Sequence, residues 1–269
     1  MGRRDVATAG CFDKLHQIWR HEVYLEMSPF HHTRKRLIMS TLMDSMSAGS
    51  SVLDAGCGIA DLMSTLCERG VAAVGTDLAL SALKFAKKRL PESNFVQSDT
   101  VYLPFRTGCY SIVVCSEVLE HVENHERAAR ELNRILLPGG IAVLTVPHGE
   151  QHWTFEDRVD GHLRRYTKKE FSHLMKRAGF SIEELRCWGF PLAVLFRKTI
   201  STPLYNRGFH ESKGQMGKSR IFTVLLRVIV TLFRFDDLFH GTQLGLGLIA
   251  KLRKPISSQN YNHPQSWAR

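Results

Sequence analysis

Acidic and small residues recur in this sequence directly after short apolar runs. Asp77, for example, closes the run VAAVGTD, and Asp99 closes NFVQSD. The whole set comprises Asp54, Gly56, Gly58, Asp77, Asp99, Ser116, Glu117 and His148. If the runs are parallel strands, their carboxyl ends meet at one edge of a sheet, where open α/β sheets bind ligands. The pattern therefore predicts a ligand site lined by carboxylates.

The turn VLDAGCGIAD, residues 52–61, indicates what kind of ligand that is. Ala60 stands where nucleotide-binding loops often carry another glycine, but the dinucleotide fingerprint G-x-G-x-x-G is not completed, and the acid Asp61 is a poor neighbour for a diphosphate. A tight strand-to-helix turn can also need glycine for steric reasons alone. Asp54 inside the turn repels an anion and suits an ammonium group. We therefore expect a cationic nucleoside without phosphate, such as S-adenosyl-L-methionine, and a loop that tolerates the small Ala60.

Apolar runs and helical segments alternate along the chain. Continuous apolar strands that alternate with helices are typical of a parallel sheet covered on both faces, and right-handed crossovers make such a sheet doubly wound. We predict an α/β fold with a doubly wound, mainly parallel, seven-stranded sheet. The expected strands are residues 51–56, 71–77, 94–99, 110–117, 141–147, 181–188 and 245–254. The expected organisation is an N-terminal helical cap (1–50), a cofactor-binding core (51–190), a helical insertion (191–243) and a last strand with a tail (244–269).

Five segments resemble, in order and spacing, the class I S-adenosylmethionine-dependent methyltransferases. The segments are VLDAGCGIAD, VGTDLALSALKFAKKR, FVQSDTVYLPF, YSIVVCSEVLEHV and LNRILLPGGIAVLTVP. The resemblance covers about residues 30–185 and is strongest to the branch (methyltransferase type 11) that contains the ubiquinone-biosynthesis O-methyltransferases. It implies a Rossmann-like methyltransferase fold, S-adenosyl-L-methionine as cofactor, and methyl transfer as activity.

The resemblance also implies roles for individual residues. Gly56 and Gly58 would lie under the methionine part of the cofactor, and Asp54 would hold the loop and the amino group. Asp77 would accept hydrogen bonds from the ribose hydroxyls. Further implied cofactor contacts are Leu78, Asp99, Thr100 and Ser116. An arginine of the preceding helix would reach the methionine carboxylate; we name Arg34, and the sequence leaves Arg36 open. Asp77 and Asp99 could each instead cap a helix.

The acceptor side needs alignment and, for a hydroxyl acceptor, a base. We expect His121 to be that base, with His148 second. The substrate side is expected to include Glu117, His152, His162, Arg165 and Tyr166, oriented by Asp160. Glu120 and His121 could instead cap the next helix. Glu117, Glu120 and His121 could also bind a divalent metal, although we expect no metal.

The expected reaction methylates a hydroxyl of a small hydrophobic molecule, such as a quinone precursor, a lipid or a polyketide-like product. Two alternatives remain open at this point: methylation of carbon or nitrogen, and an inactive methyltransferase fold that serves as a scaffold at a membrane. The retained acids Asp54, Asp77 and Asp99 argue against a scaffold.

The positive charge of the chain is concentrated in one region. Formal net charge is +10, and residues 191–235 contain eight Lys or Arg against one acid. Within them, the segment 219–235 places Thr223, Arg227, Thr231 and Arg234 along one side of an otherwise apolar helix. The region could form a lid or a homodimer contact, or bind a membrane surface peripherally. We consider nucleic acid an unlikely partner, because no aromatic-plus-basic surface motif of RNA-binding proteins accompanies the basic patch.

The six cysteines include no C-x-x-C pair, and the N-terminal residues lack the apolar run of a signal peptide. We therefore expect a reducing, cytoplasmic environment, with membrane association of the basic region as an open alternative.

Overall fold

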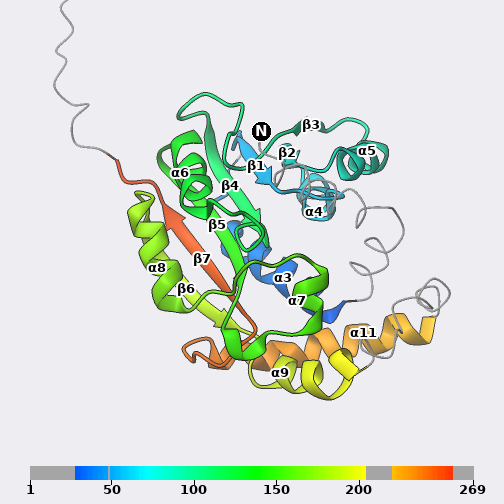
Figure 1. Ribbon diagram of the computed structural model, residues 1–269. Coiled ribbons are helices and arrows are strands. Elements are labelled where there is room, and N and C mark those ends of the chain that lie inside the picture. Colours follow the sequence, from blue (N-terminus) through cyan, green and yellow to red (C-terminus); the bar gives the residue numbers. More distant parts are fainter. Residues whose placement is uncertain (1–27, 48, 204–219, 257–269) are drawn as a thin grey trace, which may run out of the picture.

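The computed structural model describes residues 28–47, 49–203 and 220–256 of the chain. Seven strands form one sheet in the order β3-β2-β1-β4-β5-β7-β6 (Figure 1). Neighbouring strands from β3 to β5 are parallel, whereas β7 is antiparallel to both β5 and β6. The predicted mainly parallel, seven-stranded sheet is confirmed. The strands are β1 (Val52–Ala55), β2 (Ala73–Asp77), β3 (Asn94–Gln97), β4 (Tyr110–Ser116), β5 (Leu136–Pro147), β6 (Ser181–Trp188) and β7 (Gly247–Arg253).

Helices cover both faces of this sheet (Figure 1). Their starts follow from capping residues: Ser28 precedes Pro29 and accepts a hydrogen bond from the backbone N–H of His31, and Thr167 forms a capping box with Glu170. The helices that flank the sheet are α3 (Pro29–Met43), α4 (Asp61–Cys67), α5 (Leu80–Arg89), α6 (His125–Ile135) and α8 (Lys168–Arg177). The connection from β5 to α8 holds a 3-10 turn η1 (Glu150–His152) and the short α7 (Phe155–Val159).

The core has two layers because the strands are apolar on both faces. Val113 of β4 packs on the side of Leu132 and Phe171, from α6 and α8. Its neighbour Val114 packs on the other side, with Leu42 of α3. Alternate side chains of a strand point to opposite faces, which explains why these strands have continuous rather than alternating apolar sequences.

The expected helical insertion precedes β7, as predicted. It contains α9 (Leu192–Phe196), the π-helical turn η2 (Arg197–Ser201), α11 (Arg220–Leu232) and the 3-10 segment η5 (Phe233–Phe239). The helix expected over 219–235 therefore ends as an α-helix at Leu232, and its first residue lies outside the described part of the chain. None of the described helices is long and apolar enough to cross a bilayer.

Candidate cofactor and acceptor site

The turn after β1 is fastened to the end of β2. The backbone N–H groups of Gly56 and Cys57 both donate to the Thr76 carbonyl, at 2.7 and 2.8 Å. Asp77 accepts from the Gly58 N–H with Oδ2, at 2.8 Å, and from the Ala79 N–H with Oδ1, at 2.9 Å. Each carboxylate oxygen has a second lone pair, so Asp77 can still accept hydroxyl hydrogen bonds. Asp77 thus has a structural role as well as the expected position at the strand-end edge.

Three residues of this turn, Gly56, Gly58 and Ala60, have left-handed backbone conformations. Gly56 has φ +79°, and a Cβ at this position would collide with Val118. Ala60 has φ +62° although it is not glycine, and its side chain is fully buried. Ala60 was expected to be tolerated because of its small size, but its position demands a backbone conformation that L-residues adopt only at an energetic cost.

Asp54 lies beneath the turn, almost completely buried. Burial, with smaller contributions from the nearby charges of Asp77 and Asp61, raises its pKa to about 7. A cation bound beside Asp54 would favour the ionised form, because opposite charges lower the pKa of a carboxyl group. This is the electrostatic setting expected for an ammonium group.

The residues after β3 also have local roles. Asp99 Oδ1 accepts from the Val101 N–H at 3.0 Å, and Thr100 is buried. Leu78, at the end of β2, accepts a hydrogen bond from the Gln97 side chain through its carbonyl group. Neither acid caps a helix: α5 has Ala79 as its N-cap without a side-chain capping bond, and a turn follows Asp99. Each carboxylate instead accepts from the backbone N–H two residues later and keeps lone pairs for a ligand.

The structure distinguishes the two candidate arginines of α3. Arg34 lies 3.3 Å from Glu117, which directly follows β4, whereas Arg36 pairs with Asp237 of η5 at 2.8 Å. Thr145 donates to Glu117 Oε1 at 3.0 Å, and its hydroxyl is 2.8 Å from that of Ser116. Arg34, Glu117 and Ser116 therefore belong to the strand-end edge, and Arg36 belongs to the contact with the insertion.

An ion-pair cluster anchors α3 to α4 and was not foreseen from the sequence. Asp61 contacts His31 at 2.8 Å, Lys35 at 2.7 Å and Arg89 at 3.2 Å. Burial lowers the pKa of His31 to about 4, so its ring is neutral near pH 7. The cluster fixes the N-terminal part of α3, the helix that carries Arg34.

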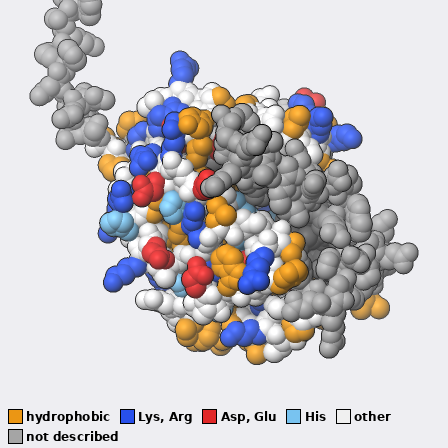
Figure 2. Space-filling model, viewed as in Figure 1, with side chains coloured by type: hydrophobic (Ala, Val, Ile, Leu, Met, Phe, Trp, Pro, Cys, Tyr) orange, Lys and Arg blue, Asp and Glu red, His pale blue; other side chains and the backbone are white. Residues whose placement is uncertain are grey.

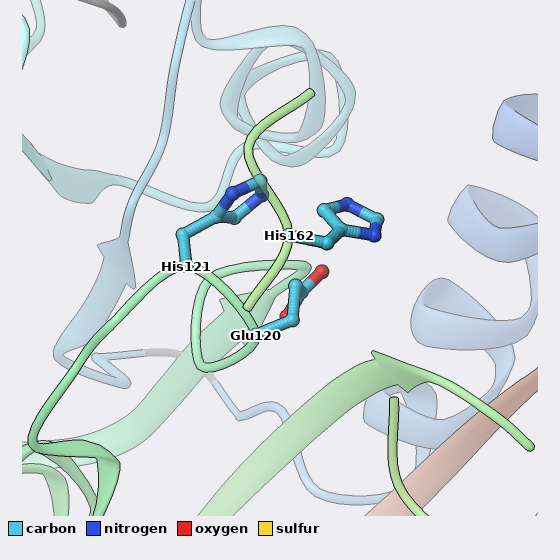
Figure 3. A group of neighbouring side chains, drawn as sticks. All are labelled: Glu120, His121 and His162. Carbon is cyan, nitrogen blue, oxygen red and sulfur yellow. The ribbon is translucent and has the colours of Figure 1, made fainter. Parts of the chain in front are cut away.

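A second cluster lies beyond β4, formed by Glu120, His121 and His162 (Figure 3). One potential ligand atom from each residue lies within 4.8 Å of the others. The imidazole rings of His121 and His162 meet edge to face, with their centroids 4.7 Å apart. Glu120 is fully buried, and neither carboxylate oxygen has a hydrogen-bond partner within the described ranges. Burial, together with the Glu117 charge, raises the pKa of Glu120 well above its usual range. A carboxyl group in such a setting is neutral unless a cation binds it.

Asp157 of α7 holds His162 in place, a contact that was not expected from the sequence. Its Oδ1 lies 2.7 Å from His162 Nδ1 and accepts from Arg165 Nε at 2.9 Å. Burial would raise the pKa of Asp157, but the hydrogen bond from His162 and the Arg165 charge hold it below its usual range. Asp160, which we expected in this role, is exposed. The capping pattern Thr154-x-x-Asp157 was the available signal for a folded role of Asp157.

Four expected site residues are instead engaged in buried contacts. His148 has Nδ1 2.7 Å from the Tyr166 carbonyl and Nε2 3.0 Å from the Gln243 carbonyl, so neither nitrogen faces an acceptor molecule. This geometry does not support His148 as a base. Tyr166 donates its hydroxyl to the Leu119 carbonyl at 3.1 Å. Arg165 pairs with the Asp157 carboxylate at 2.7 Å, and His152 Nε2 lies 3.1 Å from the Leu244 carbonyl oxygen.

Comparisons with known proteins identify the family of this chain. Residues 30–185 match the protein family described as "Methyltransferase domain". A probable S-adenosylmethionine-dependent methyltransferase of Mycolicibacterium smegmatis is 28% identical over 145 residues, which are 51% of this chain and 54% of that protein. A ubiquinone biosynthesis O-methyltransferase of Chromobacterium violaceum is 30% identical over 186 residues, 61% of this chain and 79% of that protein. The chain spans about half the length of the first of these relatives.

Among solved structures, the fold is similar to the putative methyltransferase of Haloferax volcanii in complex with the Trm112 methyltransferase activator. The TM-score is 0.65 at 18% identity, over 91% of this chain and 97% of that one. At this identity the similarity shows the fold alone.

Proposed function

This chain belongs to the class I S-adenosylmethionine-dependent methyltransferases, and we propose that it methylates a hydroxyl group of a small hydrophobic molecule. One observation carries the proposal: the chain that leaves β4 at the strand-end edge leads directly from Glu117 into the cluster of Glu120, His121 and His162, whose groups are suited to proton transfer. Glu117, which is paired with Arg34, follows β4 directly, and Glu120 and His121 come next.

The strand-end edge supplies complementary groups for each part of the cofactor. Asp77 would accept from the ribose hydroxyls, Asp54 would face the ammonium group, and Arg34 would pair with the carboxylate. S-adenosyl-L-methionine supplies, when bound, a methyl group that is already electrophilic because it is attached to a sulfonium. The protein then needs to align the acceptor and remove its proton.

We propose His162 as the proton acceptor, in the role that the sequence analysis gave to His121. Asp157 accepts a hydrogen bond from Nδ1, which leaves Nε2 of a neutral ring as the basic nitrogen. When the acceptor oxygen takes the methyl group, and the methyl–sulfur bond breaks with the neutral thioether S-adenosylhomocysteine as leaving group, the hydroxyl proton would pass to His162 Nε2. His121 packs against this ring and restricts its orientation.

A divalent cation is a second candidate occupant of the same cluster, because the buried Glu120 carboxyl group has no partner among the described residues. Glu120, His121 and His162 would hold it, and two imidazoles with one carboxylate are a donor set that suits zinc or iron. Asp157 would then orient His162 as a carboxylate behind a metal-binding histidine often does. Such a cation would lower the pKa of an acceptor hydroxyl, and so would promote the same reaction.

Two observations support a hydrophobic hydroxyl acceptor. Phe155 and Leu163, which flank Asp157 and His162 in the sequence, are large apolar residues that remain more than half exposed. Several relatives are named ubiquinone biosynthesis O-methyltransferases, and others are named demethylmenaquinone methyltransferases. The relatives named ubiquinone biosynthesis O-methyltransferases favour oxygen over carbon as the methylated atom.

The proposal is tested by product analysis. The protein is incubated with S-adenosyl-L-methionine that carries a deuterated methyl group. The acceptors are phenols that bear isoprenoid or alkyl chains. We expect a product whose mass has increased by one labelled methyl group on oxygen, in wild type but not in His162→Gln. A label on carbon or nitrogen of the acceptor, or no labelled product while the cofactor binds, would contradict the proposal.

A further inference from the structure

Helix α11 is apolar on two opposite sides. One side packs on the protein: Leu226 is buried, and Ile229 lies in a cluster with Phe233 and Ala193. The other side is exposed, with relative exposures between 49% and 81%. Its residues are Ile221, Val224, Leu225, Val228 and Leu232, which we call the α11 face. At about 3.6 residues per turn they fall within one arc of the helix. The helix thus needs an apolar environment on a side that the described protein does not cover.

Neighbouring segments extend the apolar surface. Phe235 and Leu238 of η5 are at least half exposed, as is Leu195 of α9. Figure 1 shows α9 beside α11 along one edge of the molecule, and Figure 2 shows hydrophobic side chains with Lys or Arg among them at that edge. Monomeric proteins rarely expose contiguous apolar patches of this kind unless a partner or a membrane covers them.

The charges beside the α11 face are positive. Arg227 lies on the helix between Thr223 and Thr231, at the border of the exposed apolar arc, and both Arg227 and Arg234 are exposed. The acids of η5 are engaged elsewhere: Asp236 accepts from the backbone N–H groups of Leu192 and Ala193, and Asp237 pairs with Arg36. The surface therefore combines apolar side chains with arginines that form no ion pair with an acid of residues 28–47, 49–203 or 220–256.

We propose that the α11 face docks on a lipid surface with anionic headgroups. In an interfacial helix the apolar side enters the boundary between headgroups and acyl chains, while arginines remain at the phosphates. A second copy of this chain fits less well, because a two-fold contact through this face would bring like-charged arginines together. A nucleic acid would use the arginines but leave the apolar side uncovered.

Docking would also link the lipid contact to the acceptor cluster through the insertion. Arg197 of η2 donates to Thr154 Oγ1 at 3.1 Å and pairs with Glu156 at 3.3 Å. Both contacts tie the insertion to α7, which carries Asp157 and through it His162. This consequence rests on the proposed function, whereas the docking itself does not.

The test is vesicle flotation of the full chain. Vesicles of phosphatidylcholine alone are compared with vesicles that also contain phosphatidylglycerol. We expect binding to the second kind, weakened by added salt. The variant Leu225→Gln/Val228→Gln/Leu232→Gln should lower the bound fraction about tenfold, because it removes exposed apolar groups and keeps the charge and helix propensity. Arg227→Glu/Arg234→Glu should also lower binding.

The matched control is Met43→Gln/Leu137→Gln/Ile256→Gln, which changes three exposed apolar residues on other elements and should bind like wild type. Thermal melting and S-adenosyl-L-methionine binding confirm that each variant is folded. Absence of wild-type binding to anionic vesicles overturns the proposal, as does unchanged binding of the α11 triple variant. Light scattering that shows a wild-type dimer which the triple variant makes monomeric, with vesicle binding unaffected, also overturns it. Loss of cofactor binding with intact vesicle binding would refute the proposed function alone.

Discussion

Asp157 Oδ1 lies 2.7 Å from His162 Nδ1, and the carboxylate that makes this contact is buried. The same carboxylate closes a capping box with Thr154, at 2.7 Å from the Thr154 N–H. The orientation of His162 is thus set by the first turn of α7. A carboxylate behind an imidazole fixes the tautomer and stabilises the protonated ring, which is what a general base requires.

The first prediction concerns this pair. Replacing His162 by Gln should lower kcat by about a hundredfold or more, because a positioned base contributes rate enhancements of that order. The Kd for S-adenosyl-L-methionine should change little. His121→Gln should have a smaller effect on kcat, and the exposed His173→Gln should have none. A larger loss in His121→Gln than in His162→Gln would identify His121 as the base and refute our assignment.

The second prediction concerns pH. The pKa of Asp54 is raised to about 7, so in the ligand-free protein this carboxyl group takes up a proton as the pH falls through 7. An ammonium group favours the ionised form. Affinity for S-adenosyl-L-methionine should therefore fall as the pH is lowered from about 7 towards 5.5, by at most about tenfold per unit.

Calorimetry in buffers of different ionisation enthalpy should show proton release on binding near pH 6, and Asp54→Asn should abolish it. The stability of the ligand-free protein depends on pH in the opposite sense to the cofactor affinity. Because the folded state binds the proton more tightly, the contribution of Asp54 to stability is complete below its unfolded pKa and is lost as the pH rises through 7. Affinity that stays constant across this range in wild type would argue against a role of Asp54 near the ammonium group.

The third prediction separates the two arginines of α3. Arg34→Ala should weaken cofactor binding by about ten- to a hundredfold, the usual consequence of losing a charged hydrogen bond. Arg36→Ala removes the same side chain two residues away, but its partner is Asp237 of the insertion. The affinity of Arg36→Ala for S-adenosyl-L-methionine should match that of wild type. The prediction fails if equilibrium dialysis gives equal losses for both variants.

The fourth prediction concerns the turn. Ala60→Gly should raise the free energy of unfolding by about 1 kcal/mol, because glycine adopts a φ of this sign without steric cost. Denaturant unfolding at constant ionic strength measures this change in the free energy of unfolding. Ala128→Gly, within α6, is the control and should lower stability by a similar amount, since glycine is unfavourable inside a helix. Destabilisation by Ala60→Gly would show that the buried methyl group matters more than the backbone conformation.

Features encoded locally were predictable from the sequence. The seven strands, their mainly parallel arrangement and the residues at their ends follow from apolar runs, glycine turns and helix caps. The start of α8 at Thr167, with its capping box to Glu170, follows from the same kind of local signal.

Features that depend on distant contacts were not predictable. The choice between Arg34 and Arg36 is decided by Asp237, 201 residues away from Arg36. His148 is at the expected strand end, but the Gln243 carbonyl occupies one of its nitrogens. The partner of His162 was misassigned because Asp157 and Asp160 differ in burial, which the sequence of a five-residue helix does not reveal.

Calorimetric titration of the full chain with S-adenosyl-L-methionine tests the central claim most directly. We predict saturable binding at one site in wild type, and binding at least about tenfold weaker in Asp77→Asn, which keeps a side-chain acceptor for the turn but loses the charge. Asp44→Asn, a surface acid at the end of α3, should bind like wild type. Absence of binding by folded wild-type protein would contradict the account.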